Sequence, residues 1–376
     1  MINAGLGGSV SQFLKVPNRQ YMRNKSKHHS PWGTSLRVLP WDKQEDEEPT
    51  LTEKLISSTV TEWYEAKHRE PSEEEISLIN SIEIAQCPIC GKTTFIKFGY
   101  SHEGIQQYKC KECNVRFTAL TNTIFQDRKI PISEWIEYLM HLFEFHSIAT
   151  SARDNRNASS TGTYWLHKVF AVLEDIKKDV VLEGNVYIDE MFFPVIKSKT
   201  VMKDGKKLRG ISRNKICVGC GYDDKGHVLL IVENTSKPSD RSTWKAYGTH
   251  IKPKSTLHHD GENSHGILIN NLELTSIVYT TEETKGLKDE DNPLDPINDL
   301  HGLAKRFMRE HGGYDRSNLQ CWMNLIWFIL SEPYNRFEKI RNFIEIAIST
   351  HKVVKYRDVF RKKGRRNRKN HHASAD

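Results

Sequence analysis

Four cysteines in two Cys-x-x-Cys pairs constrain the fold of this 376-residue chain more than any other feature. Nineteen residues separate the two pairs, which is the spacing of a structural zinc ribbon. In such a unit four thiolates hold one Zn²⁺ and stabilise a fold that is too small to bury a sufficient apolar core. The sequence therefore predicts a zinc-binding unit at residues 81–125. Its expected ligands are Cys87, Cys90, Cys110 and Cys113.

The residues around these cysteines have the pattern of a small antiparallel sheet. Gly91 and Asn114 follow the two pairs, and both residue types tolerate the left-handed backbone that a chain needs when it bends round a metal. Residues 94–100 and 106–109 predict two strands joined by a turn, and residues 115–117 predict a third. The alternative is that these are four unrelated buried cysteines.

Composition and charge indicate a polyanionic partner and no membrane. No apolar run approaches the roughly eighteen residues of a membrane span, and we expect no signal peptide. The three other cysteines form no disulfide framework, which fits a reducing cytoplasm. The net charge is +7, and seven of the nine residues 361–369 are basic, so the tail at 351–376 predicts contact with a polyanion. The alternative is a solvated tail without a partner. For residues 1–80 we predict a partly disordered arm that contains one helix, at 51–69.

Residues 126–180 have the layout of a helix-turn-helix. Apolar residues recur at helical spacing over 132–143, where Ser133 is the expected N-cap. A short helix at 147–153, a polar turn and a longer helix from Tyr164 to about Ile176 follow. The alternative is a plain three-helix bundle that makes no contact with a DNA groove.

From Asn185 onward the pattern changes to strands and indicates a mixed α/β domain at 181–350. An antiparallel meander comes first, and helices then alternate with strands. The predicted strands are 186–189, 216–221, 227–232, 256–260 and 276–279. The predicted helices are 244–251, 266–272, 300–309, 317–330 and 337–348.

Two aspartates are expected at the ends of apolar strands in this domain. Asp189 closes Val-Tyr-Ile-Asp, and Asp260 closes Leu-His-His-Asp. An acid at the C-terminal end of a strand is well placed to hold a divalent cation at a sheet edge. On neighbouring strands, two such carboxylates can share a pair of Mg²⁺ or Mn²⁺ ions roughly 4 Å apart, an arrangement suited to phosphodiester displacement. Each aspartate taken alone is also explained as a turn or cap residue.

The order of these motifs resembles that of a known family. From Cys87 to Leu330 the chain is similar to the zinc-ribbon DDE transposases of bacterial insertion sequences, in particular the ISXO-like group. The resemblance implies an RNase H-like core that uses Mg²⁺ to cut and join double-stranded DNA at element ends. It also implies a bacterial, nucleoid-associated protein that binds terminal inverted repeats and target DNA as a homodimer or larger assembly. The motifs beyond the cysteines are Tyr187-Ile188-Asp189-Glu190, His259-Asp260-Gly261, Asn298 with Lys305-Arg306, and His311-Gly312-Gly313.

The third catalytic position departs from the commonest DDE pattern. Many of these enzymes carry Glu where this chain has Asn298, and an amide oxygen ligates Mg²⁺ without bringing charge. Asp295 and Asp299 are the alternatives for this ligand. Lys305 lies two turns further along the helix and is placed to contact a phosphate. The catalytic set that the resemblance implies is Asp189, Asp260, Asn298 and Lys305. The expected DNA contacts are Lys168, Arg209, Arg213, Lys215 and Arg306.

One further departure leaves other functions open. Trp322-Met323-Asn324-Leu325 stands where relatives often carry an acidic pattern, which favours a DNA-binding regulator with an inactive core. The retained aspartates count against that alternative. A second alternative is an RNase H-like nuclease of repair or defence.

Cys217-Val218-Gly219-Cys220 has no partner pair and predicts strand packing. The basic residues near 209–215 are equally explained as a solvated face.

Overall fold

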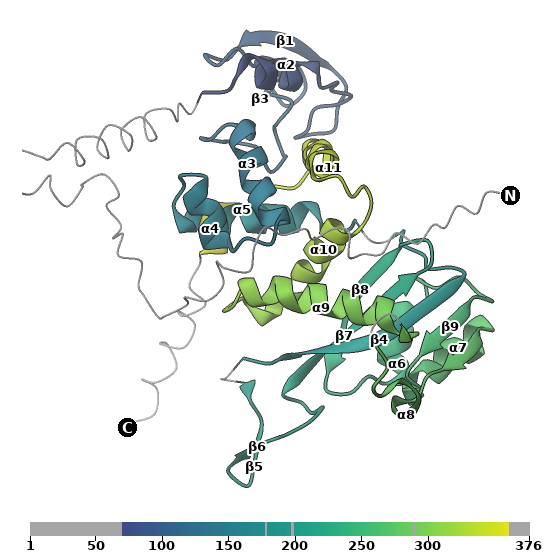
Figure 1. The fold of residues 1–376 in the computed structure, drawn as a ribbon. Coiled ribbons are helices and arrows are strands. Elements are labelled where there is room, and N and C mark those ends of the chain that lie inside the picture. Colours follow the sequence, from purple (N-terminus) through teal and green to yellow (C-terminus); the bar gives the residue numbers. More distant parts are fainter. Residues whose placement is uncertain (1–69, 177–178, 197–198, 289–290, 361–376) are drawn as a thin grey trace, which may run out of the picture. The chain divides into compact units, whose positions relative to one another are not determined.

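The computed structural model describes residues 70–176, 179–196, 199–288 and 291–360 (Figure 1). The chain separates into residues 1–70 and 71–376, and every element named below belongs to the second unit. The predicted helix at 51–69, most of the predicted arm and the basic stretch 361–369 lie outside the described residues. None of the described helices is long and apolar enough to cross a membrane.

The cysteine pairs flank a three-stranded antiparallel sheet, in agreement with the three predicted strands. Phe95, Tyr108 and Phe117 form its small aromatic core, with ring centroids 5.5 to 5.7 Å apart. Gly91 and Asn114 have φ of 70° and 60°, the left-handed conformation expected where the chain turns after each cysteine pair. A core of three aromatic rings is too small to stabilise this sheet by itself, so most of the stability of the sheet must come from other interactions. The strands are β1 (Phe95–Tyr100), β2 (Gln106–Cys110) and β3 (Arg116–Phe117).

Helix α3 (Ile132–Phe143) is capped by a residue that is distant in the sequence. The Glu75 carboxylate, on α2 (Glu73–Ser81), accepts the backbone N–H groups of Ile132 at 2.9 Å and Ser133 at 3.0 Å. The same carboxylate pairs with Arg128 at 3.0 Å, and both side chains are nearly buried. The predicted Ser133 cap is therefore wrong, because the fold brings a charged acceptor to the orphan N–H groups of the first turn.

Helices α4 (Ile148–Asp154) and α5 (Ser159–Val172) pack closely together. A Cβ atom at Gly162 would lie 2.7 Å from the Cβ of Ala152, so the close approach of the two helices requires glycine. The α5 helix begins before the predicted Tyr164 and ends before Ile176, since the polar residues 159–161 form its first turn rather than a loop. This arrangement of three helices suits both a helix-turn-helix and a plain bundle.

The second half of the chain is built on a five-stranded mixed sheet with strand order β10-β9-β4-β7-β8. The first three strands in the sequence form an antiparallel meander, and β9 and β10 run parallel to β4. This mixed α/β topology is consistent with an RNase H-like core. The strands are β4 (Asn185–Pro194), β7 (Lys215–Asp223), β8 (Val228–Thr235), β9 (Thr256–His259) and β10 (Thr275–Val278).

The two faces of this sheet pack against different helices. Side chains alternate along β4, so Met191 joins the core cluster shared with α9 and α10, whereas Ile188 joins the cluster shared with α6 and α7. Asp189 has the parity of Met191 and Glu190 that of Ile188, so the two acids point to opposite faces. Figure 1 shows α9 crossing the strands of the sheet. These helices are α6 (Asp240–Tyr247), α7 (Gly266–Leu272), α9 (Asp295–Glu310) and α10 (Leu319–Leu330).

Three predicted elements in this domain have wrong boundaries. Helix α6 spans Asp240–Tyr247 rather than residues 244–251, because the capping box of Ser239 and Ser242 starts it earlier. Strand β4 does not end at Asp189 but continues to Pro194, because it pairs with β7 along residues 186–194. Helix α9 begins at Asp295 rather than Leu300, with proline in its first turn. The other elements are β5 (Met202–Lys203), β6 (Lys206–Lys207), η5 (Asn263–His265), α8 (Thr281–Thr284), η7 (Arg316–Asn318), α11 (Arg336–Ser349) and α12 (Tyr356–Val359).

Candidate active site

Asp189 and Asp260 lie level with each other on adjacent parallel strands. Strands β4 and β9 pair with Asn185 opposite Thr256 and Tyr187 opposite His258. The same register, continued by two residues, brings position 260 opposite position 189, immediately after β9 ends. Asp189 thus lies inside β4 rather than at its end, and Asp260 is the first residue after the neighbouring strand β9.

The electrostatic environment of Asp189 favours a bound cation. Burial raises the pKa of Asp189 to about 7, and the negative charges of Asp260 and Glu190 add to this rise. The backbone N–H of Glu190, 2.7 Å from Oδ1 of Asp189, acts in the opposite direction. A divalent cation would offset both the burial cost and the mutual repulsion of the carboxylates. The donors are carboxylate oxygens, so the residues present fit Mg²⁺ or Mn²⁺.

Helix α9 brings three polar side chains to the same side as Asp189. His301 is buried, and its Nδ1 lies 3.8 Å from Oδ2 of Asp189. Asn298 precedes His301 by three residues and Lys305 follows it by four, so all three share one helix face. Asp299, two residues before His301, lies on the other side of the helix. The helix geometry therefore favours Asn298 over Asp299 as a group near the aspartates.

His301 was not singled out by the sequence analysis. Burial lowers its pKa to about 4, and the positive charge of Lys305 lowers it further, so the ring is neutral. Its Nε2 is buried and has no hydrogen-bond partner among the described residues. Its position three residues after Asn298 was the only sequence signal that could have pointed to it.

A chain of buried polar groups supports the loop that carries Asp260. His265 Nε2 lies 2.9 Å from Oε1 of Glu190, and His265 Nδ1 lies 3.0 Å from Nδ1 of His259. Nε2 of His259 in turn lies 2.9 Å from the hydroxyl of Ser276. The Glu190 contact raises the pKa of His265 against the effect of burial, and burial with the charge of His265 lowers that of His259 to about 4. These contacts fix residues 259–265 against β4.

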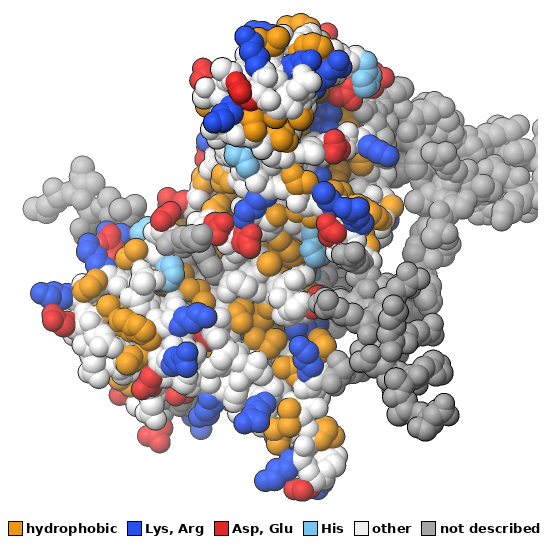
Figure 2. All heavy atoms as spheres, turned by 180° about the vertical axis from the view of Figure 1, so that it is seen from behind, with side chains coloured by type: hydrophobic (Ala, Val, Ile, Leu, Met, Phe, Trp, Pro, Cys, Tyr) orange, Lys and Arg blue, Asp and Glu red, His pale blue; other side chains and the backbone are white. Residues whose placement is uncertain are grey.

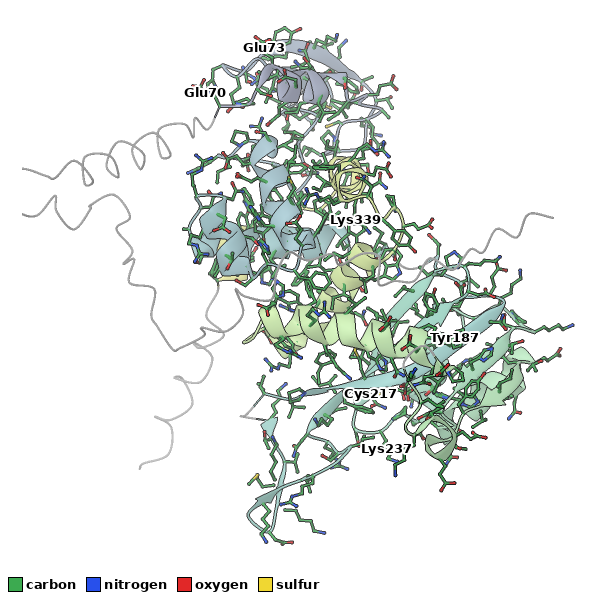
Figure 3. All side chains as sticks on the ribbon, in the orientation of Figure 1. Glu70, Glu73, Tyr187, Cys217, Lys237 and Lys339 are labelled. Carbon is green, nitrogen blue, oxygen red and sulfur yellow. The ribbon has the colours of Figure 1, made fainter. Side chains whose placement is uncertain are left out.

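A second set of contacts, around His258, packs β4 against β9 next to the candidate site. Tyr187, labelled in Figure 3, lies on β4 two residues before Asp189 and stacks on His258 with ring centroids 4.5 Å apart. Nδ1 of His258 lies 3.0 Å from the hydroxyl of Tyr279. The three histidines around Asp260, His258, His259 and His265, therefore have packing roles, in which aromatic contacts and hydrogen bonds align the segments that carry the aspartates.

The four cysteines converge on one point. Their sulfur atoms all lie within 4.8 Å of one another. Cys87 and Cys113 are 3.8 Å apart, and Cys90 and Cys110 are 3.6 Å apart. Four sulfurs at about 2.3 Å from a tetrahedral Zn²⁺ are separated by about 3.8 Å, so the cluster fits one zinc ion. Backbone N–H groups, first that of Cys113, lower the pKa of Cys110 to about 7, which favours the thiolate form that binds metal. Burial and the neighbouring cysteines raise the pKa of Cys90 and Cys113, and a bound cation would offset this effect.

The predicted DNA contacts fall into two groups. Lys168 is buried, its Nζ donates to the carbonyl of Ile124, and burial lowers its pKa to about 8. The packing of α3 and α5 encloses the ammonium group of Lys168, so we do not include this predicted DNA contact among the proposed phosphate contacts. Arg209, Arg213 and Arg306 are exposed and Lys215 is half-buried at the start of β7.

Two other sequence features belong to the core of the domain. Cys217 and Cys220 are buried on β7, and their spacing of three residues points them to opposite faces, so they pack in the sheet and cannot share a metal. Asn324, in the segment without the family acids, is buried on α10 and donates to the carbonyls of Leu173 and Glu174. Position 324 is therefore part of the packing of this fold.

Comparisons with known proteins give only distant similarity. No family model and no curated protein matches the chain. Among solved structures, the catalytic domain of Mos1 mariner transposase has 11% identity and a TM-score of 0.23, covering 50% of this chain and 95% of its own. A Mos1 transposase paired-end complex with the left transposon end has 12% identity and a TM-score of 0.24, covering 57% and 78%. At such scores the likeness carries no argument about fold or activity.

Proposed function

We propose that this protein is a DNA transposase of the DDE type, which cleaves DNA at element ends and joins the ends to a target by in-line phosphoryl transfer. The observation that supports the proposal is the position of Asp189 on β4 level with Asp260, directly after the adjacent strand β9, beside a helix with Asn298, His301 and Lys305 on one face. The family resemblance of the sequence supports the same activity.

Each polar group at this site has a role in the proposed mechanism. Asp189 and Asp260 would hold two divalent cations, which would neutralise phosphate charge and lower the pKa of the attacking oxygen. Asn298 adds an uncharged oxygen ligand, and Lys305 compensates the charge of the scissile phosphate. Water is the nucleophile for cleavage, and the freed 3′-hydroxyl is the nucleophile for strand transfer. In both steps an alkoxide oxygen leaves the phosphorus opposite the attacking oxygen.

The remaining parts of the chain would bind DNA. The four cysteines hold a structural Zn²⁺, and the helices α3 to α5 act as a helix-turn-helix that recognises the terminal inverted repeats. The exposed arginines Arg209, Arg213 and Arg306, with Lys215, contact phosphates. Figure 2 shows Lys and Arg side chains interspersed with acidic ones on one face, so we propose local phosphate contacts rather than one basic field. Pairing two ends requires a dimer or larger assembly.

The test is nicking of a supercoiled plasmid that carries the DNA flanking the gene, with purified full-length protein and Mg²⁺ or Mn²⁺. Asp189→Ala and Asp260→Ala should each reduce nicking at least about 100-fold, because removing a metal ligand abolishes charge stabilisation in the transition state. Asp299→Asn is the matched control, since its carboxylate is exposed on the other side of α9. Equal nicking by all variants would refute the assignment.

The uncharged Asn298 favours one second candidate, a DNA-binding regulator with an inactive core. That function predicts specific binding to the flanking DNA without nicking at any metal concentration. A nuclease of the same fold predicts metal-dependent nicking that does not depend on flanking inverted repeats. Comparing plasmids with and without the flanking DNA distinguishes these two outcomes from transposition.

A further inference from the structure

A second cluster of metal-ligating side chains lies in the helical segment, apart from the cysteines and the aspartates. His141, His146 and Asp154 place one ligand atom each within 4.8 Å of one another. All three side chains are half-buried, so they are held by the fold and remain accessible to solvent. They come from the last turn of α3, the connection to α4 and the last residue of α4.

The backbone of the connection positions the two imidazoles. Phe145 has φ of 67°, a left-handed conformation that turns the chain back over the end of α3. As a result the N–H of His146 donates to the carbonyl of His141 at 3.1 Å. The two rings stack with centroids 5.1 Å apart and an interplanar angle of 23°, and their Nδ1 atoms face each other at 3.2 Å.

This spacing matches two ligands of one transition-metal ion. Zn–N bonds of about 2.0–2.1 Å in tetrahedral geometry separate two nitrogens by about 3.3 Å. The Asp154 carboxylate makes one exposed contact, with Nε of Arg153 at 3.3 Å, and exposed ion pairs of this kind contribute little. Two imidazoles and a carboxylate suit Zn²⁺, Co²⁺ or Ni²⁺ rather than Mg²⁺.

We propose that His141, His146 and Asp154 form a second transition-metal site, which takes a Zn²⁺-class ion with water as the remaining ligand and fixes α4 against the end of α3. The site is independent of the proposed transposase chemistry, since none of its ligands belongs to the candidate active site. The competing explanation is a hydrogen bond between the two imidazoles without metal. That explanation requires no carboxylate, whereas metal binding uses all three groups.

The experiment measures the number of zinc ions bound by the full chain in buffered zinc with excess Mg²⁺, which competes for the aspartate site. The variants are His141→Ala, His146→Ala and Asp154→Asn, and His102→Ala, an exposed histidine elsewhere, is the control. Each cluster variant should bind one zinc ion fewer than the wild type, while the control binds the same number. Circular dichroism and Co²⁺–thiolate charge-transfer bands verify that the variants fold and retain the cysteine site.

The affinity provides a second readout. Loss of groups that only support a ligand costs about 10–100-fold in metal affinity, so removing a ligand itself should weaken this site at least about 100-fold. Added zinc should also raise the melting temperature of the wild type more than that of Asp154→Asn. The proposal would be overturned if the folded cluster variants bound as many zinc ions as the wild type. It would also be overturned if Asp154→Asn alone left zinc binding unchanged. Either result would leave the hydrogen-bonded imidazole pair as the explanation.

Discussion

The buried charge of Asp189 should lower the stability of the metal-free protein, and Asp189→Asn should restore that stability at neutral pH. The folded-state pKa of Asp189 is raised to about 7 from 3.8, chiefly by burial. A carboxyl group with a raised pKa binds its proton more tightly in the folded state than in the unfolded state. Stability therefore falls as pH rises from about 4 to about 7 and is constant above that range. Asparagine has the same shape and no charge to bury.

The size of this effect follows from the pKa. A rise from 3.8 to about 7 corresponds to roughly 4 kcal/mol as an upper limit, at about 1.4 kcal/mol for each pH unit. The Asp189 side chain is 25% exposed, and solvent screening reduces the figure to about 2 kcal/mol. We expect Asp189→Asn to stabilise the protein by about 2 kcal/mol at pH 8 and by little at pH 4.5.

Urea denaturation followed by tryptophan fluorescence, in Mg²⁺-free buffer with zinc retained, measures this difference at both pH values. Asp299→Asn, an exposed carboxylate of α9, is the control and should behave like the wild type at pH 8. Adding Mg²⁺ should stabilise the wild type and have a smaller effect on Asp189→Asn. A gain that is the same at both pH values, or a loss of stability at pH 8, would refute the electrostatic argument.

Four other substitutions test separate contacts. Glu75→Ala uncaps α3 and leaves the buried Arg128 with Glu103 as its remaining carboxylate partner, so urea denaturation should show a loss of about 3 kcal/mol. A loss below about 1 kcal/mol would contradict this. Lys168→Met should leave DNA affinity unchanged in a gel-shift titration, because the ammonium group is buried. Arg213→Ala should weaken DNA affinity and lower its salt dependence. If both variants weakened DNA affinity equally, Lys168 would be a DNA contact. Cys110→Ser should remove one bound zinc and lower the melting temperature, whereas zinc content equal to that of the wild type would exclude the cluster as a zinc site.

Local sequence patterns predicted the elements that depend on neighbouring residues. The cysteine spacing and the left-handed Gly91 and Asn114 define the first small sheet, because the turn conformation is set within a few residues. The hairpin of β7 and β8, and helix α7 at residues 266–272, were also predicted from periodicity and turn residues. Ser147 caps α4 through its own neighbour Thr150, which is again a local interaction.

Local residue patterns were enough to predict the two cysteine pairs, the alternation along the sheet strands and the position of Asp189 and Asp260 in or just after two of these strands. Only the tertiary structure decided what surrounds them. The cap by Glu75, the burial of Lys168 and the approach of His301 to Asp189 join residues far apart in the chain. Periodicity cannot encode such contacts, because it reports which face of an element is apolar and not which partner covers it.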